Sequence, residues 1–228
     1  MILGIETSGK LCSIAFGDED RALLEYNLEI PMQHAVLLAH FAEQGLRFLQ
    51  QSSFLPGQDN KKIELVAVAI GPGSFTGLRI GLSYAQGFCY GKKIPIVGIS
   101  NHQLLAVKRP QGAQTVYTLI DARREEVYLA RLDISVEGYP RLAEHKLAQK
   151  NELPQAFPSG AVLILDEQMT LYEDILNRIE KECRCTVLRA RCTAADLLKL
   201  AGRKQRLEGA DTLSGLEPMY IRPFAGVL

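Results

Sequence analysis

Apolar residues in the first half of the chain occur in two arrangements, short runs and longer stretches in which they recur every three or four positions. Short runs bounded by turn residues predict strands, whereas the wider spacing predicts amphipathic helices. The predicted strands cover residues 2–6, 11–16, 22–28, 63–70 and 94–99, and the predicted helices cover residues 33–51, 75–90 and 101–107. The segment 52–60 is rich in turn residues and is expected to be a loop.

The second half of the chain repeats this mixture of strands and helices. Its predicted strands lie at residues 115–120, 128–130, 161–165 and 186–190, and its predicted helices at residues 171–182 and 193–206. Thr193 is a candidate N-cap, because Asp196 three residues later resembles the second member of a capping box. Strands and helices mixed in this way predict an α/β protein.

A short motif recurs at the head of each half. Glu6 ends the first predicted strand, and an alanine follows nine residues later; Asp121 ends the strand at 115–120 and is followed by an alanine at the same distance. The two acids are 115 positions apart, about half of the 228 residues. The repeat predicts two related subdomains at residues 1–108 and 109–228, the second of them reduced.

Composition and charge restrict the class of protein. Hydrophobic residues make up 47% and charged residues 23% of the chain, which excludes a disordered, collagen-like or coiled-coil protein. The 26 basic side chains balance the 26 acidic ones. This balance argues against a protein whose main function is to bind the phosphates of nucleic acid. The N-terminal residues show no basic segment before an apolar core, and no apolar run reaches the roughly 20 residues of a membrane span. We therefore expect a cytoplasmic protein.

The five cysteines are expected to be free thiols of a reducing compartment. Cys183, Cys185 and Cys192 lie close together, but their spacing is not that of a zinc knuckle. Cys183, Cys185 and Val187 alternate like one face of a strand, which favours buried packing over metal binding.

Residues 71–77 (GPGSFTG) form a glycine-rich loop between a predicted strand and a predicted helix. Glycines at such a junction permit close approach of a ligand to the backbone, and a helix N-terminus binds anions. The dinucleotide fingerprint would need a glycine at Thr76, and the phosphate loop of nucleotide hydrolases would need Gly-Lys-Ser/Thr. The alternative is a tight turn that positions the following helix.

Both long helices of the first half carry more apolar surface than a single buried stripe requires. The helix at 75–90 has a stripe of Leu78, Leu82, Ala85 and Cys89 beside a second stripe of Gly77, Ile80, Gly81, Tyr84 and Phe88. The helix at 33–51 has a main stripe that includes Leu38 and Leu49, and a second one of Leu37, Phe41 and Phe48. Either these helices are sandwiched inside the protein or their second stripes face another subunit, with Gly77 and Gly81 admitting a partner helix.

Several segments resemble the bacterial TsaB family, also called YeaZ. They are residues 1–8 (MILGIETS), 71–81 (GPGSFTGLRIG), 97–100 (VGIS), 120–128 (IDARREEVY) and 218–222 (PMYIR). The resemblance runs the whole length of the chain. It implies a duplicated α/β fold of the actin/hexokinase-like (ASKHA, ribonuclease H-like) type with two related subdomains.

The resemblance also implies a function in making threonylcarbamoyladenosine, the modified base beside the tRNA anticodon. In that system the paralogue TsaD transfers the threonylcarbamoyl group, and TsaB is its non-catalytic dimerisation partner. ATP and metal are then expected on partner subunits, with a TsaE-like ATPase as third component and tRNA contacted mainly through the complex. The isolated chain is expected to form a homodimer, and no membrane partner is implied.

The family's pairing surface is built from the two long helices, here 33–51 and 75–90. The expected interface residues are Leu37, Phe41, Phe48, Phe75, Gly77, Leu78, Ile80, Gly81, Leu82, Tyr84 and Phe88. On this basis Leu82→Glu or Tyr84→Glu should abolish pairing with TsaD while the isolated chain stays folded.

The residues of the chain give little support for a catalytic site of its own. Glu6 with Thr7, Ser8 and Gly9 could form a weak nucleotide site, but no glycine follows Asp121 for backbone to approach a phosphate. Independent ATP hydrolysis is therefore disfavoured, and we expect both acids to pin hairpin turns by hydrogen bonding to backbone.

Two catalytic alternatives remain. The first is an ATPase or small-molecule kinase of the same fold, and the second is a metallopeptidase of the glycopeptidase-like group. The second would need a metal-binding histidine pair, but His34 and His40 are six residues apart. His102 and His145 stand alone, and a cap or surface role is expected for His102.

Overall fold

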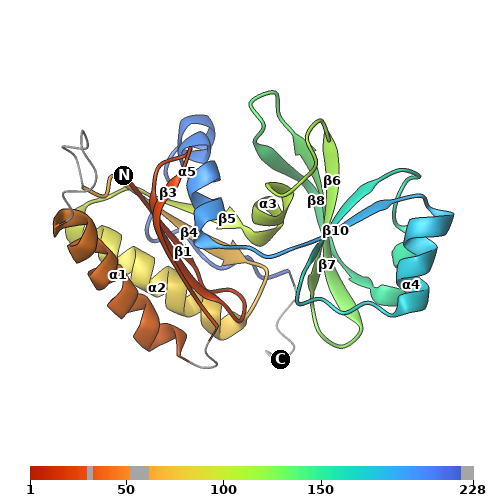
Figure 1. Ribbon diagram of the computed structural model, residues 1–228, viewed down its shortest axis with the longest axis horizontal. Coiled ribbons are helices and arrows are strands. Elements are labelled where there is room, and N and C mark those ends of the chain that lie inside the picture. The colour runs from red at the N-terminus through yellow and green to blue at the C-terminus, as the bar shows by residue number, and fades with distance from the viewer. Residues whose placement is uncertain (30–32, 52–61, 222–228) are drawn as a thin grey trace. The chain divides into compact units, whose positions relative to one another are not determined.

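The computed structural model describes residues 1–29, 33–51 and 62–221 (Figure 1). The predicted loop at 52–60 lies outside these residues. The chain divides into two compact units, the first made of Met1–Ser100 and Thr193–Pro218 and the second mainly of Asn101–Cys192. Each unit contains one five-stranded sheet.

The sheet of the first unit has the strand order β3-β2-β1-β4-β5. Its strands are β1 (Ile2–Glu6), β2 (Cys12–Gly17), β3 (Ala22–Leu28), β4 (Leu65–Gly71) and β5 (Ile96–Ser100). The strands β1, β2 and β3 form an antiparallel meander, and β4 and β5 extend it in parallel with β1. The central strands are buried on both faces, as the run at 63–70 predicts for β4.

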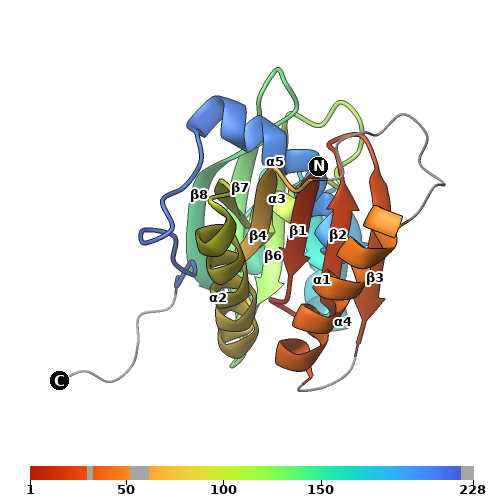
Figure 2. The ribbon, with the colours of Figure 1, turned by 90° about the vertical axis from the view of Figure 1, so that its left-hand side faces the viewer.

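Three long helices cover the first sheet. The helices α1 (His34–Gln51) and α2 (Phe75–Lys92) lie on one face, and α5 (Ala194–Glu208) lies on the other (Figure 2). Gly4 allows α5 to approach closely, because a Cβ at this position would lie 2.5 Å from the carbonyl oxygen of Ala194. The core between the sheet and α1 and α2 includes Leu3, Ile5, Phe16, Leu38 and Leu82.

The sheet of the second unit has the order β10-β9-β6-β7-β8. Its strands are β6 (Thr115–Asp121), β7 (Glu126–Ile134), β8 (Pro140–Gln149), β9 (Val162–Asp166) and β10 (Thr186–Ala190). The short helix α3 (Asn101–Ala106) packs on this sheet, and its Leu104 and Leu105 are buried. A second core contains the 3₁₀ turn η1 (Lys150–Gln155), the helix α4 (Glu173–Asn177) and the π turn η2 (Arg178–Glu182).

The two sheets share one topology, which confirms the predicted duplicated α/β fold. In each unit an antiparallel meander of three strands is followed by two parallel strands, so that β6 corresponds to β1 and β8 to β3. Glu6 and Asp121 both end the first strand of their meander. The counterpart of α1 in the second unit is only the six-residue turn η1.

The division of the chain differs from the predicted halves at 1–108 and 109–228. The boundary lies after Ser100, and Thr193–Pro218 returns to the first unit. The physical reason is the burial of α5, whose Ala194 and Leu198 pack against Ala15 of β2. The backbone N–H of Ala194 also donates a 2.8 Å hydrogen bond to the Ser13 hydroxyl.

Other local predictions can be compared directly. The capping box of Thr193 and Asp196 is confirmed at the start of α5.

The strand assignment of Cys183 and Cys185 is wrong, because both precede β10. None of the five cysteines, all of which the structure describes, forms a disulfide. Of the helices in the described part of the chain, none has the length and apolar character needed to cross a membrane.

Candidate functional site

The glycine-rich loop lies against the turn between β1 and β2. The backbone N–H of Ser74 donates a 2.6 Å hydrogen bond to the carbonyl oxygen of Ser8, and the Thr7 hydroxyl donates one of 2.8 Å to the carbonyl oxygen of Gly77. The Ser74 hydroxyl accepts from the N–H of Gly77 and so caps α2. The loop and the start of α2 are therefore bound to the turn between β1 and β2.

The glycines of this segment are required by packing inside the unit. An added Cβ would lie 2.6 Å from the Ser8 carbonyl oxygen at Gly73, and 2.0 Å from the Thr7 carbonyl oxygen at Gly77. At Gly81 it would lie 2.3 Å from the Thr7 hydroxyl oxygen. These contacts match the tight-turn alternative for the loop.

Four of the expected interface residues lie in the interior of the first unit and not on its surface. Gly77, Leu78, Gly81 and Leu82 are buried against the sheet. Their stripe faces inward because α2 rests on β1 and β4, so these side chains are not available to a partner. Leu82 belongs to the core, which argues against the expectation that Leu82→Glu leaves the chain folded.

Glu6 is a buried acid at the end of β1. Its carboxylate accepts hydrogen bonds from the Ser8 backbone N–H at 2.7 Å and from the Ser8 hydroxyl. Burial, and in second place the Glu6 charge, raise the pKa of the neighbouring Cys12 thiol to about 11. The carboxylate thus holds the turn Thr7-Ser8-Gly9 through Ser8.

Asp121 makes ion pairs in place of the backbone hydrogen bonds expected for it. Its carboxylate lies 3.5 Å from the Nζ of the buried Lys150 and 3.9 Å from the Nε of Arg123. The turn after it is left-handed at Arg123, Arg124 and Glu125, with φ values of 63°, 52° and 63°. Lys150 is fixed in turn, because its backbone N–H donates to the Glu125 carbonyl oxygen at 2.9 Å.

Histidines do not assemble a metal site in the described part of the chain, where no group of three His, Cys, Asp or Glu side chains could hold an ion. The surface or cap role expected for His102 is wrong, because this residue is fully buried in α3. Its Nδ1 lies 2.8 Å from the Thr118 hydroxyl oxygen. Burial, with a smaller contribution from His145, lowers the pKa of His102 to about 3.

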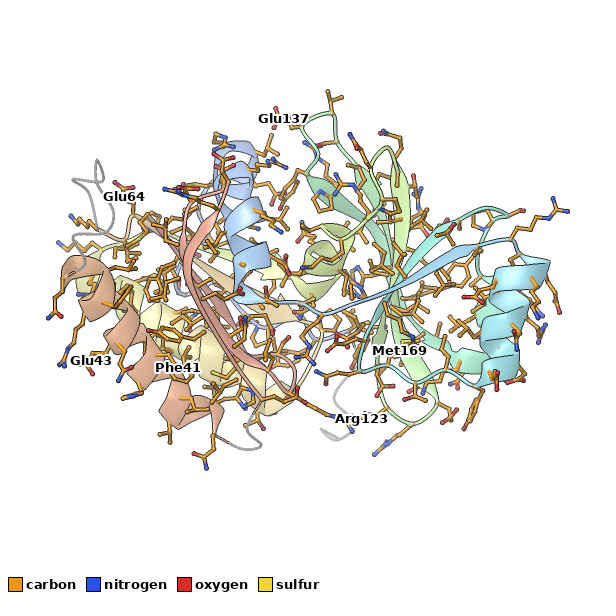
Figure 3. All side chains as sticks on the ribbon, viewed as in Figure 1. Phe41, Glu43, Glu64, Arg123, Glu137 and Met169 are labelled. Atoms are coloured by element: carbon orange, nitrogen blue, oxygen red, sulfur yellow. The ribbon has the colours of Figure 1, made fainter. Side chains whose placement is uncertain are left out.

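The solvent-accessible surface of α1 and α2 is rich in aromatic and aliphatic side chains. We call it the α1–α2 outer face and define it by the following exposed or half-buried residues: Val36, Leu37, Phe41, Phe48, Phe75, Ile80, Tyr84, Phe88 and Tyr90. Tyr90 is 80% exposed, Val36 68% and Phe48 54%. Figure 3 shows Phe41 on α1 with Glu43 close by on the same helix. Seven of the expected interface residues belong to this face.

Aromatic contacts order the α1–α2 outer face. The Phe41 ring stacks on Tyr26 of β3, with centroids 5.1 Å apart, and Tyr84 stacks on Phe88 along α2. The Arg79 guanidinium lies 3.8 Å from the centre of the Phe75 ring. These side chains present a preformed apolar surface of fixed geometry.

Two further glycines of α2 are not required by packing inside the unit. A Cβ at Gly87 or Gly91 would meet no atom within 4 Å, and both residues are exposed. A glycine in the middle of a helix costs about 0.5–1 kcal/mol relative to alanine. Ser83, Gly87 and Gly91 follow one another at intervals of four residues, so a strip of small residues on α2 is exposed to solvent. Sequence reasoning missed this strip, although its spacing was visible.

Comparisons with known proteins place the chain in a family. A sequence model of the TsaD family, described as tRNA N6-adenosine threonylcarbamoyltransferase, matches residues 39–157. The structure of YeaZ from Pseudomonas aeruginosa aligns over 96% of this chain and 98% of its own, with 27% identity and a TM-score of 0.75. The chain belongs to the TsaB/YeaZ family.

A curated relative agrees with this family. The tRNA threonylcarbamoyladenosine biosynthesis protein TsaB of Escherichia coli (strain K12) is 32% identical to this TsaB/YeaZ family member over 154 residues. The alignment covers 67% of the present chain and 63% of the relative, which is less than two thirds of the relative's length.

A more distant protein has a fold similar to that of this TsaB/YeaZ family member. The ROK hexokinase of Thermus thermophilus is 13% identical, with a TM-score of 0.51 over 88% of this chain and 96% of its own. At this identity the likeness shows the fold alone, and it agrees with the predicted actin/hexokinase-like class.

Proposed function

We propose that this chain is a scaffold subunit for the threonylcarbamoylation of the tRNA adenosine beside the anticodon. It pairs with a TsaD-type catalytic paralogue and performs no chemistry itself. The name of the E. coli relative, a threonylcarbamoyladenosine biosynthesis protein, supports the pathway. The match of residues 39–157 to the TsaD family supports a partner of the same ancestry.

The observation that carries the proposal is the α1–α2 outer face. Three of its aromatic side chains, Phe48, Phe75 and Tyr90, are exposed. Phe41, Tyr84 and Phe88 pack against the core of the first unit but stay half-buried, so part of each ring remains accessible. Monomeric proteins rarely expose a contiguous apolar patch of this kind unless it binds something. Gly87 and Gly91 add a strip on which a second helix can lie close to the α2 backbone.

The two acids favour a scaffold over an ATPase of the same fold. The carboxylate of Glu6 is already bonded to Ser8, and the backbone beside it is packed against the loop that contains Gly73 and Gly77. Asp121 is paired with Lys150 and Arg123. A phosphate that approached the backbone beside either acid would have to displace the contacts that this acid already makes.

In this proposal the remaining components act through the partner. ATP and the metal ion belong to the partner subunits, a TsaE-like ATPase is the third component, and most contacts with tRNA are made by the complex. The isolated chain self-associates through the same outer face until the catalytic subunit replaces the second copy.

The proposal is tested by the affinity of the purified chain for the TsaD-type protein of the same organism. Tyr90→Glu places a charge on the outer face, whereas Tyr172→Glu makes the same change at a residue of the second unit that is 58% exposed. We expect Tyr90→Glu to weaken pairing at least about tenfold and Tyr172→Glu to leave it unchanged. Equal affinities of all three chains would remove the outer face from the interface.

A second measurement separates the scaffold from the ATPase alternative. The purified chain is assayed alone for ATP turnover, together with Glu6→Ala. Turnover that disappears in Glu6→Ala would contradict the scaffold and support an enzyme of the actin/hexokinase-like fold.

A further inference from the structure

One end of the α1–α2 outer face carries a hollow that combines an apolar floor with a basic rim. The hollow has a volume of about 310 Å³ and lies at the C-terminal ends of α1 and α2, with Leu46, Ile63, Phe88 and Ile94 among its lining residues. Lys62 and Lys92 also line it, and a neighbouring hollow of about 390 Å³ adds Lys93. Phe88 is a member of the outer face, so the hollow continues that surface.

The basic rim is poorly compensated within the described part of the chain. Glu64 is the acid beside these lysines, and its carboxylate is bound to the N-terminal ammonium group at 2.9 Å. That hydrogen bond and charge, with a smaller contribution from Lys62, hold the pKa of Glu64 below its usual range. The lining of the two hollows thus contains three lysines and one carboxylate that is already bound to the N-terminal ammonium group, so the excess charge is positive.

Two lysines are held at the rim by the end of α2. The Lys92 ammonium lies 5.3 Å from the centre of the Phe88 ring. Lys93 is the C-cap of α2 in a left-handed conformation, with φ of 53°, and its backbone N–H donates to Cys89. Glycine is the usual residue at such a position. The chain has a lysine there, although the backbone geometry favours glycine.

We propose that this hollow receives an acidic segment of the protein partner, with an apolar side chain over Phe88 and Ile63 and carboxylates at Lys62, Lys92 and Lys93. The inference rests on the proposed function, because the partner is the TsaD-type subunit on the outer face. Carboxylates complement the rim, and an apolar side chain complements the floor. A nucleic-acid backbone would satisfy the lysines but leave the apolar floor exposed.

A second copy of the chain is a poorer occupant than a different protein. α2 contains no acidic residue, and the one acid of α1, Glu43, is paired with Arg47 at 2.6 Å. Self-pairing through the outer face therefore brings few carboxylates to the lysines. The rim selects a partner of opposite charge, which is a means of specificity as well as of affinity.

The test compares Lys92→Gln/Lys93→Gln with a matched control, Lys146→Gln/Lys181→Gln, whose lysines are exposed in the second unit. Affinity for the purified TsaD-type partner is measured at about 50 mM and about 500 mM NaCl, since added salt screens exposed charges. We expect the first variant to bind about tenfold more weakly than wild type at low salt and to lose most of the salt dependence. The control should follow the wild type, and self-association of the first variant should not weaken.

Each other result contradicts the inference. If the first variant pairs like the wild type at both salt concentrations, the hollow takes no acidic segment, while the proposed function stands. If wild-type chain does not bind the partner at all, both the function and the inference fail. If the variant keeps its affinity for the partner but loses binding of labelled tRNA in the same buffers, the occupant is nucleic acid.

Discussion

Thr7 and Gly77 make two contacts with each other. The Thr7 hydroxyl donates a 2.8 Å hydrogen bond to the Gly77 carbonyl oxygen. The Thr7 carbonyl oxygen occupies the space that a Gly77 side chain would need. The contact fixes the start of α2 on the β1–β2 turn. We expect Gly77→Ala to destabilise the chain by about 3 kcal/mol, at the upper end of overpacking effects, because a Cβ would lie 2.0 Å from that oxygen. Urea denaturation measures the change, and a loss below about 0.5 kcal/mol would mean that the contact is loose.

Gly87→Ala should have the opposite effect on the isolated chain. Nothing lies within 4 Å of the new methyl group, and alanine is the better helix former, so stability is expected to rise by about 0.5–1 kcal/mol. Pairing with the TsaD-type partner should nevertheless weaken, since the methyl group would separate a helix from the α2 backbone. Denaturation and affinity are measured on the same preparation. Tighter or unchanged pairing would exclude Gly87 from the contact.

These two glycines illustrate what can be inferred from the amino-acid sequence. Periodicity locates both long helices and their excess of apolar surface, because a stripe repeats at the helical period whatever covers it. It does not say which stripe meets the sheet, since that depends on long-range pairing of β1 with β4. Periodicity therefore assigns Gly77 and Gly81 to a partner, whereas open space lies beside Gly87 and Gly91.

The second unit shows a similar limit. The apolar pattern does not reveal the edge strand β8, because most of its residues are exposed, among them Arg141, Glu144, His145 and Lys146. Charged residues are common on edge strands, which must avoid pairing with other chains. The duplicated topology identifies β8 as the counterpart of β3, but only once both sheets are known. The return of α5 to the first unit likewise depends on contacts between residues about 180 positions apart, as in the bond from Ala194 to Ser13.

Leu82→Glu should unfold the chain instead of only breaking an interface. Leu82 is 5% exposed within the core of the first unit, and burying an unpaired carboxylate there is expected to cost at least about 4 kcal/mol. Tyr90→Glu, at a residue that is 80% exposed, should change stability by less than about 0.5 kcal/mol. Circular dichroism during heating distinguishes the two variants. A Leu82→Glu chain that melts like the wild type would place this side chain on the outside of α2.

Stability should fall in mild acid because of His102. The pKa of this residue is about 3 in the folded chain, and the usual histidine value of about 6.5 applies when it is unfolded, so the unfolded state binds the proton more readily. The contribution of His102 is therefore complete above about pH 6.5 and is lost as the pH falls towards 3, by up to about 1.4 kcal/mol per pH unit. Urea denaturation in steps from about pH 7.5 to pH 5 follows this loss before most carboxylates protonate. His102→Gln removes the titrating group and should flatten the dependence, whereas His40→Gln, at an exposed residue of α1, should keep the wild-type slope. If His102→Gln lost stability as steeply as the wild type, another group would be responsible for the acid sensitivity.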